Sequence, residues 1–448
     1  MTTLTASTAK LVCGFARIAV PEEAIYRSKL AVLDCVGVAL AGSREPVSRV
    51  VRGLALETSG GSEATIWGTG HKVSFLEAAL VNGTMSHALD YDDMNRSMLG
   101  HPSAVLVPAL FALGEKIEAP GRDLLKGYVL GLEAMARLGR IFGPQAYDKS
   151  WHPTAILGVV GACASSSYLL RLAYEVALNA IGIAASEASG IKKNFGSMVK
   201  SLHAGSAARK GLWAALLASK GLTAGSNALD GHFGFMEMFD GTLRDIALPD
   251  STGEPLEILK SGLIYKQYPC CGGLHSVLDN ALLLRQKEAI RPEHVADVEC
   301  RVHPQKVAYL DRPRVNEGLE AKFSIQYCVA AALLDGRVGL RQFSNESVLR
   351  ADAQALMRKI RVIPGVDLDG FASEVSVRDV DGRRFSNRLP EPKGSASAPL
   401  TEDELLRKFV DCAMVSMSSG RAKKAAAALM RLETQSELRD VLQLLVAD

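Results

Sequence analysis

Metal and nucleotide motifs are missing from this sequence of 448 residues. Its eight cysteines include no Cys-x-x-Cys pair, the usual spacing of a zinc ribbon or an iron–sulfur cluster, and their low density is typical of a reducing, cytoplasmic location. There is no His-Glu-x-x-His and no P-loop, and Gly68-x-Gly70-x-x-Val73 lacks the third glycine of a dinucleotide fingerprint. A cofactor-poor enzyme fits these absences, and so does a large helical interaction protein.

The chain also has little net charge and no long apolar run. Its 51 Lys and Arg against 49 Asp and Glu give +2, which argues against a nucleic-acid coat or a polybasic membrane surface. Residues 1–10 carry no apolar core of a secretory signal. The most apolar stretch, residues 155–164, is too short to span a bilayer. We therefore expect neither nucleic-acid nor membrane partners, although a local basic pocket stays possible.

Helical periodicity dominates the first half of the chain. Apolar residues recur at helical spacing, and small residues are frequent among them, which suits closely packed helices. The predicted helices are 21–40, 74–89, 102–118, 121–141, 152–171, 173–187, 202–219 and 221–228. The pattern predicts one all-helical domain over residues 1–258.

The sequence changes character after residue 260, where strands alternate with helices. Asp381-Gly382 lies between two alternating segments, as in a β-hairpin. The predicted strands are 296–303, 360–363, 374–380 and 383–389. The predicted helices are 275–289, 321–334 and 346–358. Residues 259–399 are therefore predicted to form an α+β domain.

The C-terminal residues are expected to be helical again. Thr401 and Glu404 form a capping box at the start of segment 401–413, and a further helical segment covers 418–446. Residues 400–448 would then complete the domain of residues 1–258. The predicted fold is mainly α, with the smaller α+β domain inserted as a lid.

Candidate chemistry is densest in the acidic stretch His87-Ala-Leu-Asp90-Tyr-Asp92-Asp93. On a helix, His87, Asp90 and Asp93 would share one face. Carboxylates this close repel one another, so we expect at least one raised pKa, as general acid–base catalysis requires. A solvated acidic helix end would give the same pattern, and both interpretations stay open at this point.

Two histidines stand directly before prolines, in His101-Pro102 and His152-Pro153. Proline restricts the residue before it to extended geometry and suits the first turn of a helix, so each imidazole is expected at a helix entrance. Backbone amides there suit a substrate carboxylate. Lys200, just before a Gly/Ala-rich helix, can reach into a cleft, although exposure is the default for a lysine.

A glycine-rich loop lies between two further basic residues, Lys266 and His275. Gly272-Gly273 in this loop allows a ligand to approach the backbone closely. The adjacent cysteines Cys270-Cys271 are too close together for an ordinary redox or metal pair, and we interpret them as packing residues.

These and other segments resemble the MmgE/PrpD family, in order over nearly the whole chain. Each is weak alone, but together they are specific. The matching segments are Asn82-Gly83, His87 to Asp93, His101-Pro102-Ser103, His152-Pro153-Thr154, Lys200 to Gly211, Gly231-x-x-Gly234-Phe235, Lys266-Gln-Tyr268-Pro269 with His275, Lys322 to Tyr327, and Pro392 to Ser395. The resemblance implies a cleft between a helical domain and its lid, a homodimer, and no metal or other cofactor.

The resemblance also implies which residues line the site. The implied catalytic residues are Asp90, His101, His152, Lys200 and His275. The implied substrate-binding residues are Lys266, Tyr309, Met94 and Arg209. The chain departs from the family at Met94-Asn95, where many members have Thr-His, and methionine cannot donate a hydrogen bond as threonine can. This departure leaves the substrate open.

The expected activity is that of a metal-independent lyase that removes a proton next to a carboxylate of a small di- or tricarboxylate. Asp90 or a histidine would be the base, and the remaining basic groups would bind carboxylates or protonate the leaving group. Dehydration of a 2-methylcitrate- or citrate-like substrate is the first expectation. Decarboxylation or epimerisation of a cis-aconitate- or iminodisuccinate-like substrate shares the carbanion-like step and is the alternative.

Two further alternatives come from other classes of protein. The stretch Asp90-Tyr-Asp92-Asp93 is similar to the aspartate-rich motif of an all-α, Mg²⁺-dependent prenyl-diphosphate enzyme, although no second acidic motif follows. An inactive binding homologue is the other alternative, suggested by Met94-Asn95.

Overall fold

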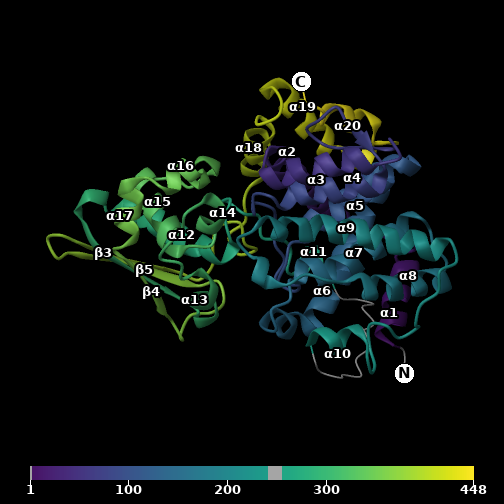
Figure 1. The fold of residues 1–448 in the computed structure, drawn as a ribbon, viewed down its shortest axis with the longest axis horizontal. Helices are drawn as coiled ribbons and strands as arrows, with labels where there is room; N and C mark the ends of the chain where they lie inside the picture. Colours follow the sequence, from purple (N-terminus) through teal and green to yellow (C-terminus); the bar gives the residue numbers. More distant parts are fainter. Residues whose placement is uncertain (1–2, 241–254, 448) are drawn as a thin grey trace. The chain divides into compact units, whose positions relative to one another are not determined.

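The computed structural model describes residues 3–240 and 255–447 of the chain. It divides the chain into two compact units (Figure 1). Unit 1 comprises Met1–Ile264 and Thr401–Asp448, and unit 2 comprises Tyr265–Leu400. The units meet at 264/265 and 400/401, where the sequence led us to expect domain boundaries at 258/259 and 399/400. The prediction of a mainly α fold with a smaller α+β part is confirmed.

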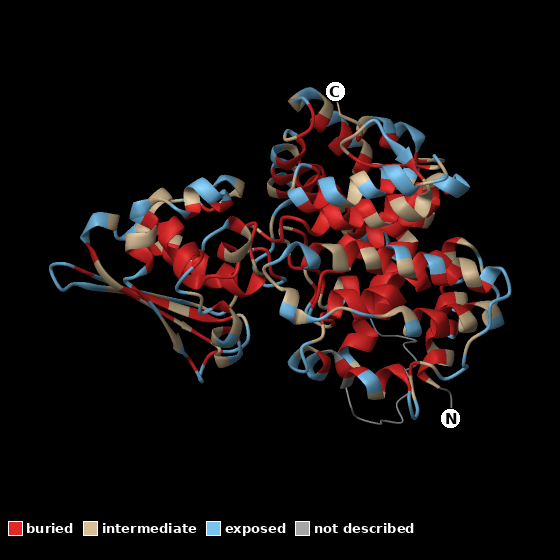
Figure 2. Cartoon of the chain, in the orientation of Figure 1, coloured by how far each residue is buried: buried red, intermediate tan, exposed pale blue. Residues whose placement is uncertain are grey.

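The described residues of unit 1 form helices and one short antiparallel pair of strands, β1 (Ala64–Thr65) and β2 (Lys72–Val73). Helices α5 and α7 are buried along nearly their whole length and form the centre of its core (Figure 2). The helices of its first segment are α1 (Leu4–Phe15), α2 (Glu22–Gly42), α3 (Pro46–Thr58), α4 (Phe75–His87), α5 (Ser103–Ile117), α6 (Gly121–Asp148), α7 (Pro153–Leu169), α8 (Tyr174–Glu187), the 3₁₀ turn η1 (Lys192–Asn194), α9 (Met198–Ser219), α10 (Phe235–Asp240) and α11 (Glu257–Lys260).

Close packing of α4, α7 and α9 depends on glycine. A Cβ atom on Gly83 of α4 would lie 2.7 Å from the Gly205 Cα of α9. A Cβ on Gly211 of α9 would lie 2.4 Å from the Val159 carbonyl oxygen of α7. Such distances exclude any side chain, so glycine lets these backbones approach. The packing brings the end of α4 next to the starts of α7 and α9.

The C-terminal segment adds helices to unit 1. The predicted capping box is confirmed, since Thr401 Oγ1 accepts from the Glu404 amide and the Glu404 carboxylate accepts from the Thr401 amide. The elements of this segment are α18 (Glu402–Ala413), α19 (Ser419–Leu429), the 3₁₀ turn η5 (Leu432–Thr434) and α20 (Arg439–Leu444). Helix α18 packs on α2.

Unit 2 contains a four-stranded sheet in the order β4-β3-β5-β6. The strands are β3 (Val295–Val302), β4 (Ile360–Pro364), β5 (Ser373–Asp379) and β6 (Arg384–Leu389). Strand β3 runs parallel to β4 and antiparallel to β5. The predicted hairpin is confirmed: β5 and β6 pair antiparallel, and Gly382 between them has a φ of +84°.

Helices of unit 2 pack on this sheet, α12 against β5 and β6 and α15 against β4 (Figure 1). The helices are α12 (His275–Lys287), α13 (Pro304–Leu310), α14 (Gly318–Ala321), α15 (Ile325–Asp335), α16 (Asn345–Val348) and α17 (Ala351–Met357). The 3₁₀ turns are η2 (Gly272–Leu274), η3 (Pro292–His294) and η4 (Leu340–Phe343). The predicted helices 321–334 and 346–358 are each interrupted. Residues 322–324 separate α14 from α15, and residues 349–350 separate α16 from α17.

One predicted helix, 221–228, is wrong, because these residues form turns and irregular structure. Gly221 has a φ of +98° and follows the end of α9. The Ala224 amide donates to the Asn179 side chain (3.0 Å) instead of to a helical carbonyl. Two glycines in eight residues, Gly221 and Gly225, weaken helix formation more than the alanines favour it.

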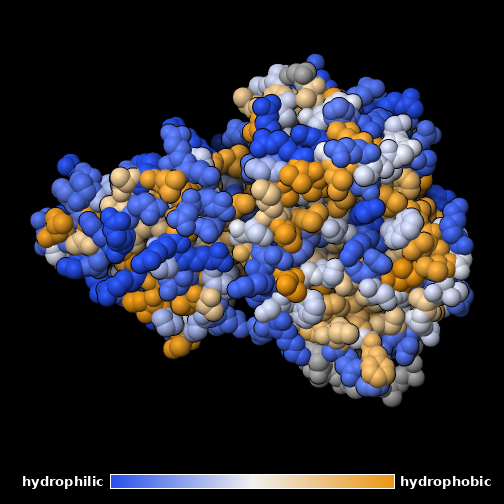
Figure 3. Space-filling view, in the orientation of Figure 1, coloured by the Kyte–Doolittle hydropathy of each residue, from blue (hydrophilic) through white to orange (hydrophobic). Residues whose placement is uncertain are grey.

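The surface mixes polar and apolar residues. On the face drawn in Figure 3, hydrophilic and hydrophobic residues are interspersed over both units. Among the described residues, none of the helices combines the length and apolar character needed to cross a bilayer.

Candidate active site

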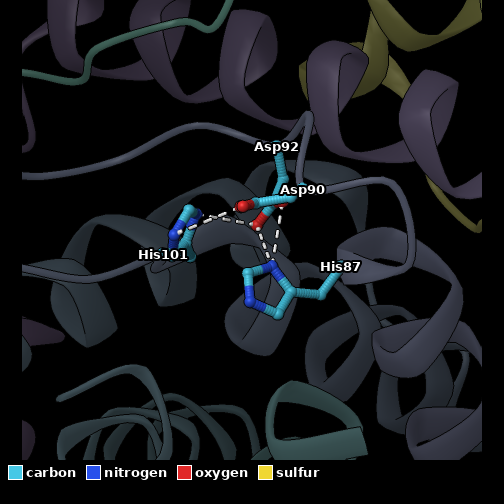
Figure 4. A group of neighbouring side chains, drawn as sticks. All are labelled: His87, Asp90, Asp92 and His101. Atoms are coloured by element: carbon cyan, nitrogen blue, oxygen red, sulfur yellow. Dashed lines mark hydrogen bonds and ion pairs between the residues drawn. The ribbon is translucent and has the colours of Figure 1, made fainter. Parts of the chain in front are cut away.

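The acidic stretch forms a loop that follows the last residue of α4. Helix α4 ends at His87, and Asp90 has a φ of +51°, in the left-handed region. The expectation that His87, Asp90 and Asp93 share one helix face is therefore wrong, because a left-handed residue ends the helical repeat. The turn instead directs Asp90 and Asp92 toward His101, as Figure 4 shows.

Lys200 and Asp90 form a buried ion pair. Lys200 lies in the first turn of α9, and its Nζ is 2.8 Å from Asp90 Oδ1. Both side chains are less than a tenth exposed, so the default expectation of an exposed lysine is wrong here. Removing one partner of such a pair leaves an uncompensated buried charge, which typically costs about 3–5 kcal/mol. The pair holds a cation and an anion together where solvent cannot replace either.

His101 stands at the entrance of α5, as its Pro102 neighbour predicts. Its Nδ1 lies 2.9 Å from the Asp93 carbonyl oxygen and 3.2 Å from Asp92 Oδ2. Its Nε2 faces Asp90 Oδ1 at 3.8 Å. One ring nitrogen is thus occupied by the loop, and the other is directed toward the Lys200–Asp90 pair.

Three further imidazoles surround this group. His87 Nδ1 lies 2.9 Å from both carboxylate oxygens of Asp92. His152, the N-cap of α7, stacks on His87 with ring centroids 5.9 Å apart. Its Nδ1 is 3.1 Å from that of His203 in α9. The expected helix-entrance position of His152 is confirmed.

The ends of several helices converge on these side chains. His101 precedes α5, His152 caps α7, and Lys200 opens α9, so three helix N-termini meet around Asp90. The His101 amide donates to Thr154 Oγ1 (3.0 Å), which joins the starts of α5 and α7. Helix N-termini carry a partial positive charge and favour bound anions. The arrangement suits a substrate with carboxylates.

Burial shifts the ionisation of these groups in different directions. It lowers the pKa of His87 to about 4 and that of His152 well below its ordinary value, with Lys200 adding to the effect in both cases. Burial, the charge of Asp34 and the neighbouring Asp92 raise the pKa of Asp93 well above its usual range, as crowding of carboxylates predicts. Against burial, the imidazoles of His87 and His101 lower the pKa of Asp92. We therefore infer neutral His87 and ionised Asp92 near neutral pH.

These shifts predict that unit 1 loses stability in mild acid. Burial lowers the pKa of His87 to about 4 and, together with neighbouring positive charge, that of His203 to about 4; the pKa of His152 is lowered further. Between about pH 6.5 and 4 the unfolded chain therefore binds protons that the folded chain does not, so stability falls as pH falls. The raised pKa of Asp93 has the opposite effect, but one carboxyl is outweighed by three histidines.

Urea unfolding at several pH values measures this effect. All three tryptophans (Trp67, Trp151 and Trp213) belong to unit 1, so their fluorescence follows that unit. We expect the urea midpoint to decrease steadily from pH 7 to pH 5, with up to about 1.4 kcal/mol per pH unit from each fully buried histidine. The exposed His71 provides the control, since His71→Gln should retain the slope. A midpoint independent of pH would contradict the inferred neutral histidines.

The cluster could also bind a divalent metal. Donor atoms of His87, Asp90, Asp92 and His101 lie within 4.8 Å of one another, and imidazole and carboxylate suit such ions. However, the Lys200 ammonium already lies 2.8 Å from Asp90 Oδ1, and a bound dication would be repelled by it. The donor set therefore fits a divalent metal poorly beside the Lys200 ammonium.

Three of the remaining predicted residues, His275, Lys266 and Tyr309, lie in unit 2. His275 opens α12, with its Nε2 3.4 Å from the Cys270 carbonyl oxygen and its ring packed against Tyr268. Lys266 is fully buried. The Tyr309 hydroxyl packs at Gly273, where a Cβ would be 3.2 Å from it. Unit 2 thus gathers these residues around its glycine-rich loop, and a pocket shared with Asp90 stays a prediction.

Two predicted substrate-binding residues of unit 1, Met94 and Arg209, have partners other than Lys200 and Asp90. Met94 pairs through its backbone with Ile264, and the Asn95 side chain donates to Glu257 (3.0 Å), so Asn95 has a structural role. Arg209 is about half exposed and pairs with Glu77 at 2.9 Å. Their roles in substrate binding stay predictions.

Three residues of the cluster were not among the predicted site residues: His87, Asp92 and His203. His87 and Asp92 were visible in the acidic stretch, but their pairing depends on the turn at Asp90. His203 lies three residues after Lys200, so helical spacing alone places both on one face of α9. This spacing was the signal in the sequence that could have identified His203.

Comparison with family models identifies both parts of the chain. The MmgE/PrpD N-terminal domain matches residues 6–244, and the MmgE/PrpD C-terminal domain matches residues 268–434. These two matches together cover most of the chain and both units.

Comparison with characterised proteins gives relatives over most of the chain. A cis-aconitate decarboxylase of Mus musculus is 30% identical over 86% of this chain and 81% of its own length. One of Aspergillus terreus is 26% identical over 95% of this chain and 92% of its own. A 2-methylcitrate dehydratase of Salmonella typhimurium is 24% identical over 82% of this chain and 80% of its own. The relatives are enzymes.

Proposed function

Because this chain belongs to the MmgE/PrpD family, we propose that it is a lyase that acts on a small tricarboxylate, with decarboxylation of a cis-aconitate-like substrate as its reaction. The buried Lys200–Asp90 pair beside His101 carries the proposal, because it supplies a fixed cation, a carboxylate and an imidazole at one place. Three helix N-termini around them favour an anionic substrate.

The order of the candidate reactions follows the comparisons. Dehydration of a 2-methylcitrate-like substrate was the first expectation from the sequence. The decarboxylase of Mus musculus is more similar to this chain than the dehydratase of Salmonella typhimurium, 30% against 24% identical. This difference supports decarboxylation first and dehydration second. Homodimer formation is proposed with it, on the family resemblance alone.

The chemistry of cis-aconitate explains why these groups are useful. When the carboxymethyl group loses CO₂, its electron pair shifts through the neighbouring double bond toward the far carboxylate. Negative charge then develops on oxygens of that carboxylate, and a fixed ammonium stabilises it more strongly than water does, because it needs no reorientation. We propose Lys200 for this role.

A proton must then be added to the carbon that received the electron pair. We propose His101 as the donor, because its Nε2 is directed to the Lys200–Asp90 pair while its Nδ1 is held by the loop. The carboxylates of Asp90 and Asp92 lie on either side of this imidazole. His152 would bind a carboxylate at the start of α7. In a dehydration, the same imidazole would remove a proton instead.

The test is a substrate screen with two readouts. The full chain is incubated with cis-aconitate, 2-methylcitrate and citrate, while CO₂ release and the ultraviolet absorbance of a new conjugated double bond are followed. CO₂ release from cis-aconitate supports the proposal. A new absorbance with 2-methylcitrate and no CO₂ would replace it by dehydration. Binding without turnover of any of them would favour an inactive homologue.

Chelation is expected to leave this activity unchanged. The Mg²⁺-dependent alternative requires a metal at the acidic stretch, whereas a Lys200–Asp90 pair works without one. We expect turnover after dialysis against EDTA to equal that before dialysis. Loss of activity that Mg²⁺ or another divalent ion restores would contradict the proposed mechanism and favour the alternative.

A further inference from the structure

We propose that Lys408, on the C-terminal helix α18, is a positioning residue that holds the loop of Asp90 and Asp92 in its active shape. The inference rests on the proposed function, because the loop matters only if these carboxylates take part in the reaction. It assigns a role to the segment after unit 2 that none of the sequence motifs indicated.

Lys408 makes three contacts within unit 1. Its Nζ donates to the Tyr91 carbonyl oxygen at 2.8 Å and lies 3.9 Å from the centre of the Tyr91 ring. The same Nζ is 2.6 Å from Asp34 Oδ1 of α2. Only 7% of the Lys408 side chain is exposed, and Asp34 is fully buried. One buried ammonium therefore joins α18, α2 and the loop.

Close packing of α18 on α2 brings Lys408 to this position. A Cβ on Gly37 of α2 would lie 2.9 Å from the Phe409 side chain and 3.1 Å from its Cα. The two helices therefore approach as closely as a glycine allows. Residue 408, next to Phe409, is then close enough to α2 for its ammonium to meet Asp34, one turn before Gly37.

Lys408 binds the carbonyl oxygen of Tyr91. Tyr91 lies between Asp90 and Asp92, the two residues whose carboxylates face His101. Asp90, directly before Tyr91, has the left-handed backbone, a conformation that a non-glycine residue adopts at a cost of about 1–3 kcal/mol unless its surroundings hold it.

On the other side of Tyr91, the loop makes several contacts with His101 and its neighbours. Asp92 contacts His87 and His101, and the Asp93 carbonyl accepts from His101. A hydrogen bond at Tyr91 therefore restrains the turn from which these groups project. A shift of the turn would move Asp90 and the Asp93 carbonyl relative to His101.

A loss of activity in the single variant Lys408→Met could come from lower stability as well as from a displaced loop, because this variant leaves Asp34 buried without its cation. The double variant Asp34→Asn/Lys408→Met removes both charges. The single variant Asp34→Asn is its matched control, since it removes the ion pair but keeps the Lys408 contact with Tyr91. Neither Asp34 nor Lys408 touches Asp90, His101 or Lys200 in the contacts described above, so a direct catalytic effect is not expected.

We expect Asp34→Asn to unfold at a lower urea concentration than the double variant, followed by tryptophan fluorescence, because it leaves the Lys408 ammonium buried without its carboxylate. The activities are therefore compared per folded protein, under conditions in which both variants are folded. Relative to Asp34→Asn, the double variant should show kcat lower by about 10- to 100-fold, the size of effect that a small misplacement of catalytic groups produces, while KM changes little. Equal kcat in the two variants would overturn the proposal, and so would a loss of kcat that disappears once unfolded protein is corrected for.

Hydrogen–deuterium exchange separates this inference from the proposed function. Amides of residues 88–95 should exchange faster in the double variant than in Asp34→Asn, with or without a substrate. Residues 295–302 of unit 2 are the control segment, and their exchange should be the same in both variants. Faster exchange in a protein that turns over no substrate would sink the proposed function but keep the restraint on the loop. Unchanged exchange at 88–95 would refute the restraint itself.

Discussion

Lys200→Met is expected to lower kcat/KM by about a thousandfold, the loss seen when a donor aimed at developing charge is removed. Lys200 Nζ lies 2.8 Å from Asp90 Oδ1, and both are buried. Methionine retains most of the volume of the lysine stem but carries no charge. The substrate carboxylate would then lose its fixed cation, and Asp90 would repel it. Steady-state kinetics with the substrate identified by the screen measures the loss.

Stability has to be separated from catalysis in this variant, since Asp90 would be left as an unpaired buried charge. The double variant Lys200→Met/Asp90→Asn removes that charge, so it should unfold near the wild-type urea midpoint and stay inactive. Lys210→Met is the matched control on the same helix, because the Lys210 Nζ bonds only Glu187 and Ser189 in the described contacts. If Lys200→Met kept near-normal turnover, Lys200 would not stabilise the transition state.

The two helix entrances with His-Pro dipeptides were predictable because their cause is local. Proline before the first helical turn constrains the residue before it whatever the rest of the chain does. His101 and His152 accordingly stand where the sequence placed them. The hairpin around Gly382 was predictable for the same reason, since an Asp-Gly turn acts over a few residues.

The loop at Asp90 and the burial of Lys200 were not predictable in this way. A left-handed Asp90 is unfavourable locally and is held by contacts from distant segments, such as Lys200 of α9 and Lys408 of α18. Burial of a lysine likewise depends on a partner that only the packed helices supply. Residue spacing along single segments therefore indicated candidate residues but not their geometry, and only the family resemblance grouped these candidates into one predicted site.

His101→Gln is expected to lower kcat by about 100- to 10,000-fold, the usual contribution of a general acid or base. Glutamine keeps a polar side chain of similar length but cannot take up or release a proton near neutral pH. The neighbouring carboxylates stay paired, with Asp90 on Lys200 and Asp92 on His87, so the fold should survive. Kinetics and the urea midpoint of unit 1 are measured together.

A second variant distinguishes proton transfer from support of the loop. His101→Asn can place its amide nitrogen near the position of Nδ1, so it can still donate to the Asp93 carbonyl oxygen, but it has nothing at the position of Nε2. If His101 is the proton donor, His101→Asn should be as inactive as His101→Gln. If its task is to hold the loop, His101→Asn should recover much of the activity. His232→Gln, on an exposed histidine that pairs with Glu237, should leave kcat unchanged. Activity in His101→Asn close to that of the wild type would therefore move the proton donor elsewhere, with His152 as the next candidate because it reaches the same cluster from α7.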